Sequence, residues 1–217
     1  TLFETAAAWH QLASAQGLLV ELAISALTIV KAIALASLIT FALTMLATTA
    51  LFKAPITWSS SFRFLGFAGI TYLFTLWTSD GTSLKLWLLV FGMTVFLLTN
   101  TLSVLDSITQ EQLDYGRTLR LDSWSLAWEL YAKGKLADNF DLVRQNAAVG
   151  WTLLSVVEGL VRSEGGIGSL LLTQSKYLHL SSIFAIQLTI LGYGLVQDFT
   201  LAQLKKLICP YTNLPSS

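Results

Sequence analysis

The feature that most constrains this fold is a series of long apolar stretches, the longest of which covers residues 18–52. A helix of about twenty apolar residues crosses a bilayer, so this stretch is long enough to span one. Of the 217 residues, 54% are hydrophobic and only 12% are charged, and the mean hydropathy is +0.64. A soluble domain carries about 25% charged residues. We therefore predict an integral membrane protein in contact with the lipid bilayer.

The apolar stretches predict an all-α, polytopic transmembrane helical bundle with five spans, formed by a single domain over residues 1–217. We expect the spans at about residues 18–52, 62–77, 84–105, 146–161 and 181–208. Residues 1–17 are mildly amphipathic and carry Phe3 and Trp9, which is typical of a helix at the membrane interface. Residues 162–180 are expected to form a loop and a short helix.

The distribution of basic residues predicts the orientation, because Lys and Arg concentrate in cytoplasmic loops. With five spans, most of them fall on the side that carries residues 109–136 and the C-terminus. We therefore expect that side to be cytoplasmic, and residues 162–180 to be extracytoplasmic.

A charge-dense segment separates the third and fourth predicted spans. Its charged residues are Asp114, Arg117, Arg120, Asp122, Glu129, Lys133, Lys135, Asp138, Asp141 and Arg144. Leucine and tryptophan residues between them are spaced to give a helix one apolar face. We interpret residues 109–131 as a cytoplasmic helix-turn-helix whose Trp and Leu side either packs on the spans or fills a partner's groove. The alternative is a solvated loop that only sets the topology.

This segment resembles the "EAA" coupling segment of permease subunits in ATP-binding-cassette importers. The matching run is Asp114-Tyr115-Gly116-Arg117-Thr118-Leu119, followed by Trp124. Val157-Glu158-Gly159 and Gly165-Gly166-Ile167-Gly168 resemble a later region of the same family, and residues 187–198 resemble its last helix. The resemblance covers about residues 16–207 and is closest to the nitrate, sulfonate, taurine and bicarbonate subgroup.

The chain departs from the family pattern at the coupling segment. Asp114, Tyr115 and Gly116 stand where the family has Glu-Ala-Ala, and Arg120 replaces a later Gly. Family members also carry one more span, so we expect a sixth, N-terminal span to be missing from this sequence.

The resemblance implies half of a translocation pathway in a bacterial inner membrane. It implies cytoplasmic ATPase subunits that bind the ATP, an extracytoplasmic substrate-binding protein, and a second permease copy, either identical or related. This chain itself would need no cofactor. Leu119, Trp124 and Trp128 are the expected anchors for the ATPase, with Asp114, Arg117 and Arg120 as a charged rim.

Three ionisable residues within the spans are candidates for the pathway, because a charge at that depth needs a partner or a wet cavity. Lys31 attracts an anionic substrate, pairs with an acid such as Glu158, or extends its ammonium to the membrane interface. Glu158 lines the pathway or pairs with Arg162, four residues on. Asp198 lines the cytoplasmic mouth or bonds across helices.

Other functions find less support in the sequence. Gly165, Gly166 and Gly168 predict a tight extracytoplasmic turn, and a phosphate loop would need the Lys-Ser/Thr pair that is absent here. The zero net charge gives no indication of nucleic-acid binding. One cysteine excludes a thiolate metal cluster, and no hydrolase motif occurs. A non-conducting scaffold subunit stays open as the alternative. Because of Lys31 we expect the cargo to be a small anion, such as nitrate, bicarbonate or a sulfonate, and a small uncharged heterocycle stays open.

Overall fold

The computed structural model describes residues 2–15 and 17–210. These residues form helices and, within the described ranges, no strand, which confirms the all-α prediction. The α-helices are α1 (Leu2–Ala15), α2 (Leu18–Ala47), α3 (Ala50–Ser59), α4 (Phe67–Trp77), α5 (Gly81–Asp106), α6 (Gln110–Thr118), α7 (Ser123–Ala127), α8 (Leu136–Leu160), α9 (Ile167–Lys176) and α10 (Leu180–Ile208). Two 3₁₀ helices, η1 (Ser60–Phe64) and η3 (Arg162–Glu164), and a π-helix, η2 (Trp128–Lys133), complete the chain.

Among the described residues, three helices are long and apolar enough to cross a membrane: α2, α5 and α10. The predicted first span is shorter than expected, because the Thr48 and Thr49 hydroxyls bond back to the carbonyls of Met45 and Leu46, and an extended Thr49 then starts α3. The predicted span at 62–77 is divided at an extended Gly66 and leaves an eleven-residue α4. Helix α8 begins ten residues before the predicted span, in the charged segment.

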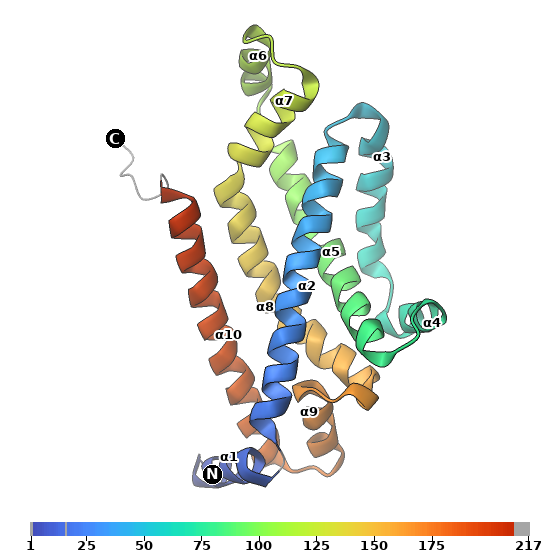
Figure 1. Cartoon of the computed structure of the whole chain (residues 1–217), viewed down its shortest axis with the longest axis vertical. Helices are drawn as coiled ribbons and strands as arrows, with labels where there is room; N and C mark the ends of the chain where they lie inside the picture. The colour runs from blue at the N-terminus through green and yellow to red at the C-terminus, as the bar shows by residue number, and fades with distance from the viewer. Residues whose placement is uncertain (1, 16, 211–217) are drawn as a thin grey trace.

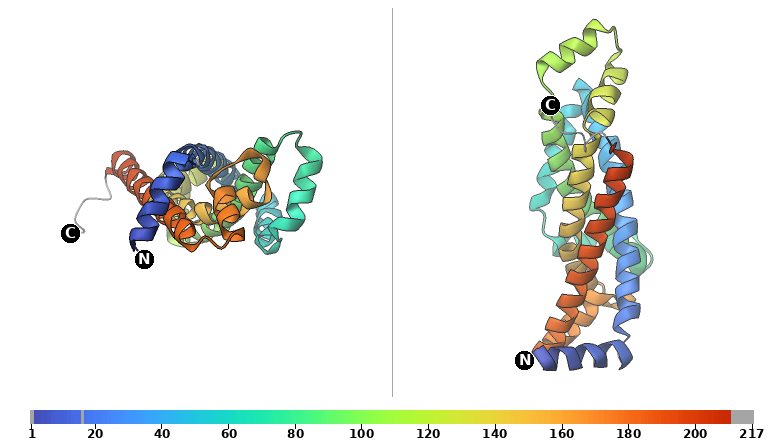
Figure 2. Two further views of the ribbon diagram at one scale, coloured as in Figure 1. Left: turned by 90° about the horizontal axis from the view of Figure 1, so that it is seen from below. Right: turned by 90° about the vertical axis from the view of Figure 1, so that its left-hand side faces the viewer.

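Helices α2, α5, α8 and α10 run along the long axis of the molecule, and α1 lies across one end of them (Figures 1 and 2). Trp9 holds α1 to α10 by donating to Thr189 Oγ1 over 3.1 Å. Helices α6 and α7 and the last turn of α10 lie at the opposite end (Figure 1). The charged segment and the end of α10 therefore share one side of the bundle.

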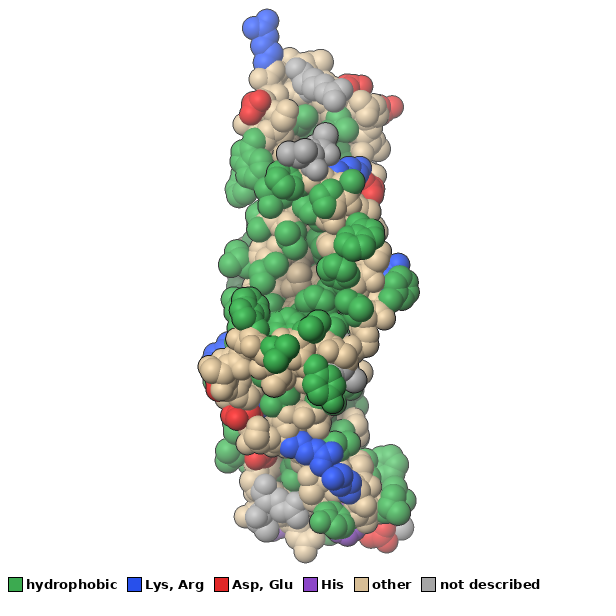
Figure 3. All heavy atoms as spheres, turned by 90° about the vertical axis from the view of Figure 1, so that its right-hand side faces the viewer, with side chains coloured by type: hydrophobic (Ala, Val, Ile, Leu, Met, Phe, Trp, Pro, Cys, Tyr) green, Lys and Arg blue, Asp and Glu red, His purple; other side chains and the backbone are tan. Residues whose placement is uncertain are grey.

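The main core joins α2, α5, α8 and α10 through fully buried side chains that include Ile29, Met93 and Leu154. Outside this core, many large apolar side chains are exposed, and in Figure 3 hydrophobic side chains dominate the middle of the face shown. Helix α10 is the least covered of the three apolar helices, since only 11% of its most apolar stretch is buried within the protein. An exposed apolar band of this kind marks a surface for lipid or for a partner helix.

Candidate functional site

The predicted coupling segment projects beyond the ends of α2 and α5 (Figure 1). Its first helix, α6, starts with a reciprocal cap. The Thr109 amide donates to Gln112 Oε1 (3.1 Å), and the Gln112 amide donates to Thr109 Oγ1 (3.4 Å). This Thr-x-x-Gln pattern satisfies two amides that a helix start leaves without an internal acceptor. The helix ends before Arg120, whose φ of 55° turns the chain towards α7.

Gly116 lies where α6 and α7 pack. A Cβ atom at this position would collide with Leu126 Cδ1, so the buried Leu126 side chain occupies the space that glycine leaves. This contact gives Gly116 a packing role within the predicted coupling segment.

Leu119 and Trp124, two of the expected anchors, lie on the outside of this segment, whereas Trp128 is partly exposed and packs edge-on against Phe41 of α2. Tyr115, Leu119, Trp124 and Trp128 are all exposed, at 69%, 58%, 50% and 44% respectively. Asp114 accepts a hydrogen bond from Gln110 Nε2, and Asp114 and Arg120 are both exposed. The side chain of Arg117 lies outside the described part of the structure. The segment therefore presents an apolar surface with a polar rim to the space beyond the bundle.

Residues that the sequence analysis did not single out fasten this segment to the bundle. In a small buried cluster, Met45 of α2 packs with Ala127, Tyr131 and Ala132. The rings of Phe41 and Tyr131 stack with their centroids 6.1 Å apart. The apolar periodicity of the segment indicates that some of its residues pack against the bundle. It does not show which of the apolar residues face inward.

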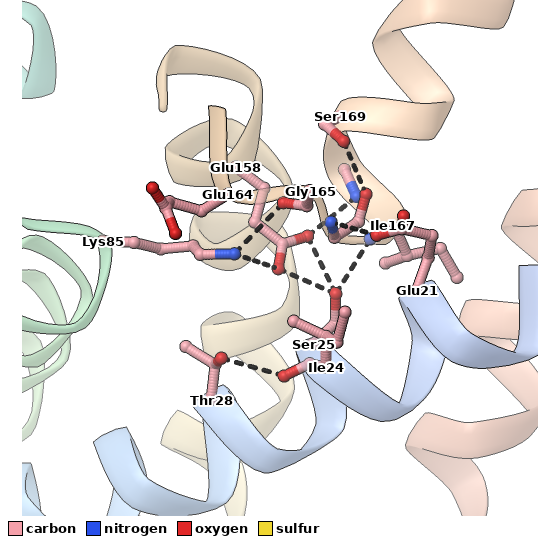
Figure 4. A network of polar contacts seen from close by, with 12 residues as sticks. Glu21, Ile24, Ser25, Thr28, Lys85, Glu158, Glu164, Gly165, Ile167 and Ser169 are labelled. Atoms are coloured by element: carbon pink, nitrogen blue, oxygen red, sulfur yellow. Dashed lines mark hydrogen bonds and ion pairs between the residues drawn. The ribbon is translucent and has the colours of Figure 1, made fainter. Parts of the chain in front are cut away.

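A second candidate region lies at the other end of the bundle, around Glu158 (Figure 4). Its carboxylate is fully buried and accepts hydrogen bonds from Ser25 Oγ (2.7 and 2.9 Å) and from the Gly168 amide (2.8 Å). The Lys85 ammonium lies 3.5 Å from Glu158 Oε1 and is only 1% exposed. A buried charge requires such a partner and such hydrogen bonds.

The partner of Glu158 differs from both sequence predictions. The Arg162 side chain donates to the Gly159 carbonyl instead (3.2 Å), and Lys31 is exposed on α2. The i,i+4 spacing brings Arg162 to the same face of a regular helix, but α8 ends at Leu160, so the two residues no longer share that face. Lys85 lies just inside the predicted span at residues 84–105, so the rule that singled out Lys31, that a charge within a span needs a partner, could also have found it.

The same network holds the glycine turn. Gly165 and Gly166 have φ values of 65° and 109°, which favour glycine strongly. The Lys85 ammonium donates to the Gly165 carbonyl (3.1 Å), the Gly166 amide donates to Glu21 Oε2, and the Ile167 amide donates to Ser25 Oγ (2.9 Å). Gly166 and Gly168 are buried, so much of this turn packs inward and connects α2, α5 and α8.

Asp198 bonds across helices. Its carboxylate forms a bidentate pair with Arg144 of α8, in which Arg144 Nη2 lies 2.6 Å from Asp198 Oδ2 and Arg144 Nε donates to Oδ1. Lys205 and Asp141 form a second link between α10 and α8 at 2.6 Å. Arg144 and Asp198 line a groove of about 360 Å³ between the two helices. The Arg144–Asp198 pair joins α8 to α10, whereas Lys31 is exposed on α2 and Glu158 is buried at the other end of the bundle. The three predicted pathway residues therefore belong to three separate environments.

Within the described ranges, no group of three or more His, Cys, Asp or Glu side chains is placed to hold a metal ion. Comparison of the chain with protein-family models, with curated proteins and with solved structures finds no match.

Proposed function

We propose that this chain is the membrane-spanning permease subunit of an ATP-binding-cassette importer and that residues 109–136 couple it to a separate ATPase subunit. The observation that carries the proposal is the position of α6 and α7. They project from one end of an apolar bundle and expose Tyr115, Leu119 and Trp124. Leu126 of α7 and Tyr131 of the following η2 are buried. Such a segment has the two faces that a lever between a partner and the bundle requires.

The proposal includes five membrane crossings. Helices α2, α5 and α10 supply three of them. The broken pair α3 and α4 and the charged helix α8 would supply the other two, with neighbouring helices covering their polar groups. A second copy of the chain would cover part of the exposed face of α10 and complete the pathway in a bacterial inner membrane, opposite an extracytoplasmic binding protein.

Affinity capture from native membranes tests the coupling role. The tagged chain should co-purify with an ATPase whose peptides carry the nucleotide-binding motifs of this class. Leu119→Asp with Trp124→Asp should abolish the capture, since two exposed apolar contacts become charged. Tyr177→Asp with Leu180→Asp is the matched control, because these apolar side chains are at least as exposed and lie at the opposite end. Loss of capture in the control as well, or no ATPase with the unchanged chain, would contradict the proposal.

A non-conducting scaffold subunit is the second candidate. It is favoured by the burial of Glu158, whose carboxylate is occupied by Ser25, Lys85 and Gly168 and does not face an open lumen. Vesicles that contain the chain and the captured ATPase distinguish the two. A permease should make ATP hydrolysis respond to the binding protein, whereas a scaffold should leave the hydrolysis rate unchanged.

A further inference from the structure

A cavity of about 490 Å³ lies between the predicted coupling segment and the ends of the apolar helices. One wall comes from α6, α7 and η2, and the other comes from α3 and the last residues of α2 and α5. Its volume is within the range for small-molecule sites, and it is larger than the groove between α8 and α10. A ligand in this cavity would touch the coupling segment and the bundle at the same time.

The lengths of α2 and α5 place the cavity at the level of the lipid headgroups. Helix α2 has 30 residues and α5 has 26. At about 1.5 Å per residue, they measure about 45 and 39 Å. The hydrocarbon core of a bilayer is about 30 Å thick, and the bilayer measures about 40 to 45 Å with its headgroups. Two helices of this length that cross a membrane carry their last residues into the headgroup region. Ala47 and Asp106 are those last residues, and both line the cavity.

Much of the cavity wall is aliphatic, and this part of it is not fully covered by the protein. The lining residues that are only half-buried are Leu105, Ile108, Leu113, Leu121 and Leu130. They belong to both sides of the cavity. A concave apolar surface that is left uncovered favours the binding of an apolar group. At this depth, the upper part of the acyl chains of a lipid is the nearest apolar material.

The wall also carries one pair of opposite charges. Lys53 Nζ lies 3.3 Å from Asp106 Oδ1, and the two side chains are 60% and 65% exposed, so both are accessible to a ligand. Of the described residues that line this cavity, only these two are charged. Their charges cancel, so the pair matches a ligand that carries both signs better than a net anion or a net cation.

We propose that this cavity binds a membrane phospholipid with a phosphoethanolamine headgroup, which carries an anionic phosphate and a primary ammonium. Lys53 donates to the phosphate, and Asp106 accepts from the ammonium. The acyl chains lie along the aliphatic wall. The bound lipid supports the coupling segment where it meets the bundle. This inference needs only that α2 and α5 cross a membrane, and it does not depend on an ATPase.

Retention of lipid by the purified full chain tests this site. The protein is placed in nanodiscs that contain equal amounts of phosphatidylethanolamine and phosphatidylglycerol with identical acyl chains. It is then released into detergent, and native mass spectrometry identifies the lipids that stay bound. The chain should retain one lipid and favour phosphatidylethanolamine about fivefold, because the anionic headgroup lacks the ammonium that pairs with Asp106. Equal retention of the two lipids would overturn the inference.

Neutralisation of the acid tests the role of the charged pair. Asp106→Asn should abolish the preference, since the ammonium loses its partner and phosphatidylglycerol is no longer repelled. Glu129→Gln is the matched control and should keep the preference. Glu129 also forms an exposed pair with a lysine, Lys133 (2.6 Å), but neither residue lines this cavity. The same effect in both variants, or no effect in Asp106→Asn, would contradict the proposed role.

A bulky side chain tests the location. Ser123 is exposed and lines the cavity, so Ser123→Trp should fill the space and abolish lipid retention. Ser125→Trp should keep the lipid, because Ser125 is also exposed on α7 but is not a lining residue. Thermal unfolding of both variants verifies that they fold. Retention by a folded Ser123→Trp would overturn the site. Displacement of the lipid by soluble glycerophosphoethanolamine would overturn the lipid assignment, since the site would then take the headgroup without the chains.

Discussion

The Lys85 ammonium and the Glu158 carboxylate lie 3.5 Å apart and their side chains are 1% and 0% exposed, although the two residues are 73 positions apart in the chain. Lys85 also donates to the Gly165 carbonyl, and Glu158 also accepts from Ser25 and Gly168. A buried pair of this kind contributes little net stability compared with apolar residues, but breaking it leaves one charge without compensation. It therefore defines how α2, α5, α8 and the glycine turn meet.

Replacement of Lys85 should show this asymmetry. Lys85→Met should lower the free energy of unfolding by about 3 to 5 kcal/mol, because Glu158 loses its buried counter-charge. The double variant with Glu158→Gln should recover part of that loss. Lys31→Met is the matched control, since Lys31 is an exposed lysine on a neighbouring apolar helix, and it should stay within about 0.5 kcal/mol. Unfolding in detergent micelles measures all three, and an equal effect of the two single lysine variants would refute the pairing.

The glycine turn gives a second, independent test of the same network. Gly166→Ala should destabilise the protein by about 2 kcal/mol or more, because φ is 109° and a Cβ atom would collide with the Glu158 carboxyl group. Gly192→Ala should be neutral or slightly stabilising, since this helical glycine has no atom within 4 Å of the added Cβ. Thermal unfolding of the two variants side by side checks the difference. A tolerated Gly166→Ala would mean that the turn is not held in this conformation.

The sequence was sufficient for features that depend on local pattern. The all-α class follows from the long apolar stretches, and the short helix expected within residues 162–180 is α9 (Ile167–Lys176). It was not sufficient for contacts between helices. Periodicity relates Glu158 to Arg162 on one helix, but it carries no information on which helix lies next to α8, so Lys85 was not predicted as the partner of Glu158.

Two further differences have local causes. The expected span at 62–77 is interrupted because the backbone of Gly66 is extended. Hydropathy does not predict the backbone conformation of a glycine. Tyr131 reads as one more apolar residue of the charged segment, whereas the π-turn places its hydroxyl beside Asn139. Both depend on backbone conformations that vary from the regular helix on which periodicity arguments rest.

The cap of α6 should control the stability of the segment proposed to meet the ATPase. Thr109→Ala removes the acceptor of the Gln112 amide and should cost about 1 kcal/mol locally, without changing the unfolding of the bundle. Hydrogen exchange should become faster at the amides of Glu111 and Gln112. Thr118→Ala is the control, because the Thr118 hydroxyl bonds to the Tyr115 carbonyl at the other end of the same helix. Unchanged exchange in Thr109→Ala would show that the cap does not hold the helix start.

The start of α5 should respond to pH through Asp80. The Ser83 amide donates to Asp80 Oδ2 (3.0 Å), and this hydrogen bond holds the pKa of Asp80 below its usual value. The charged carboxylate is therefore the capping form, so its stabilisation is complete above the unfolded pKa of about 4 and is lost as the pH falls through the lower folded value. Hydrogen exchange in the first turn of α5 should accelerate over that range. Asp80→Asn caps without titrating and should remove this acceleration. Identical pH profiles for the two proteins would exclude Asp80 as the titrating group.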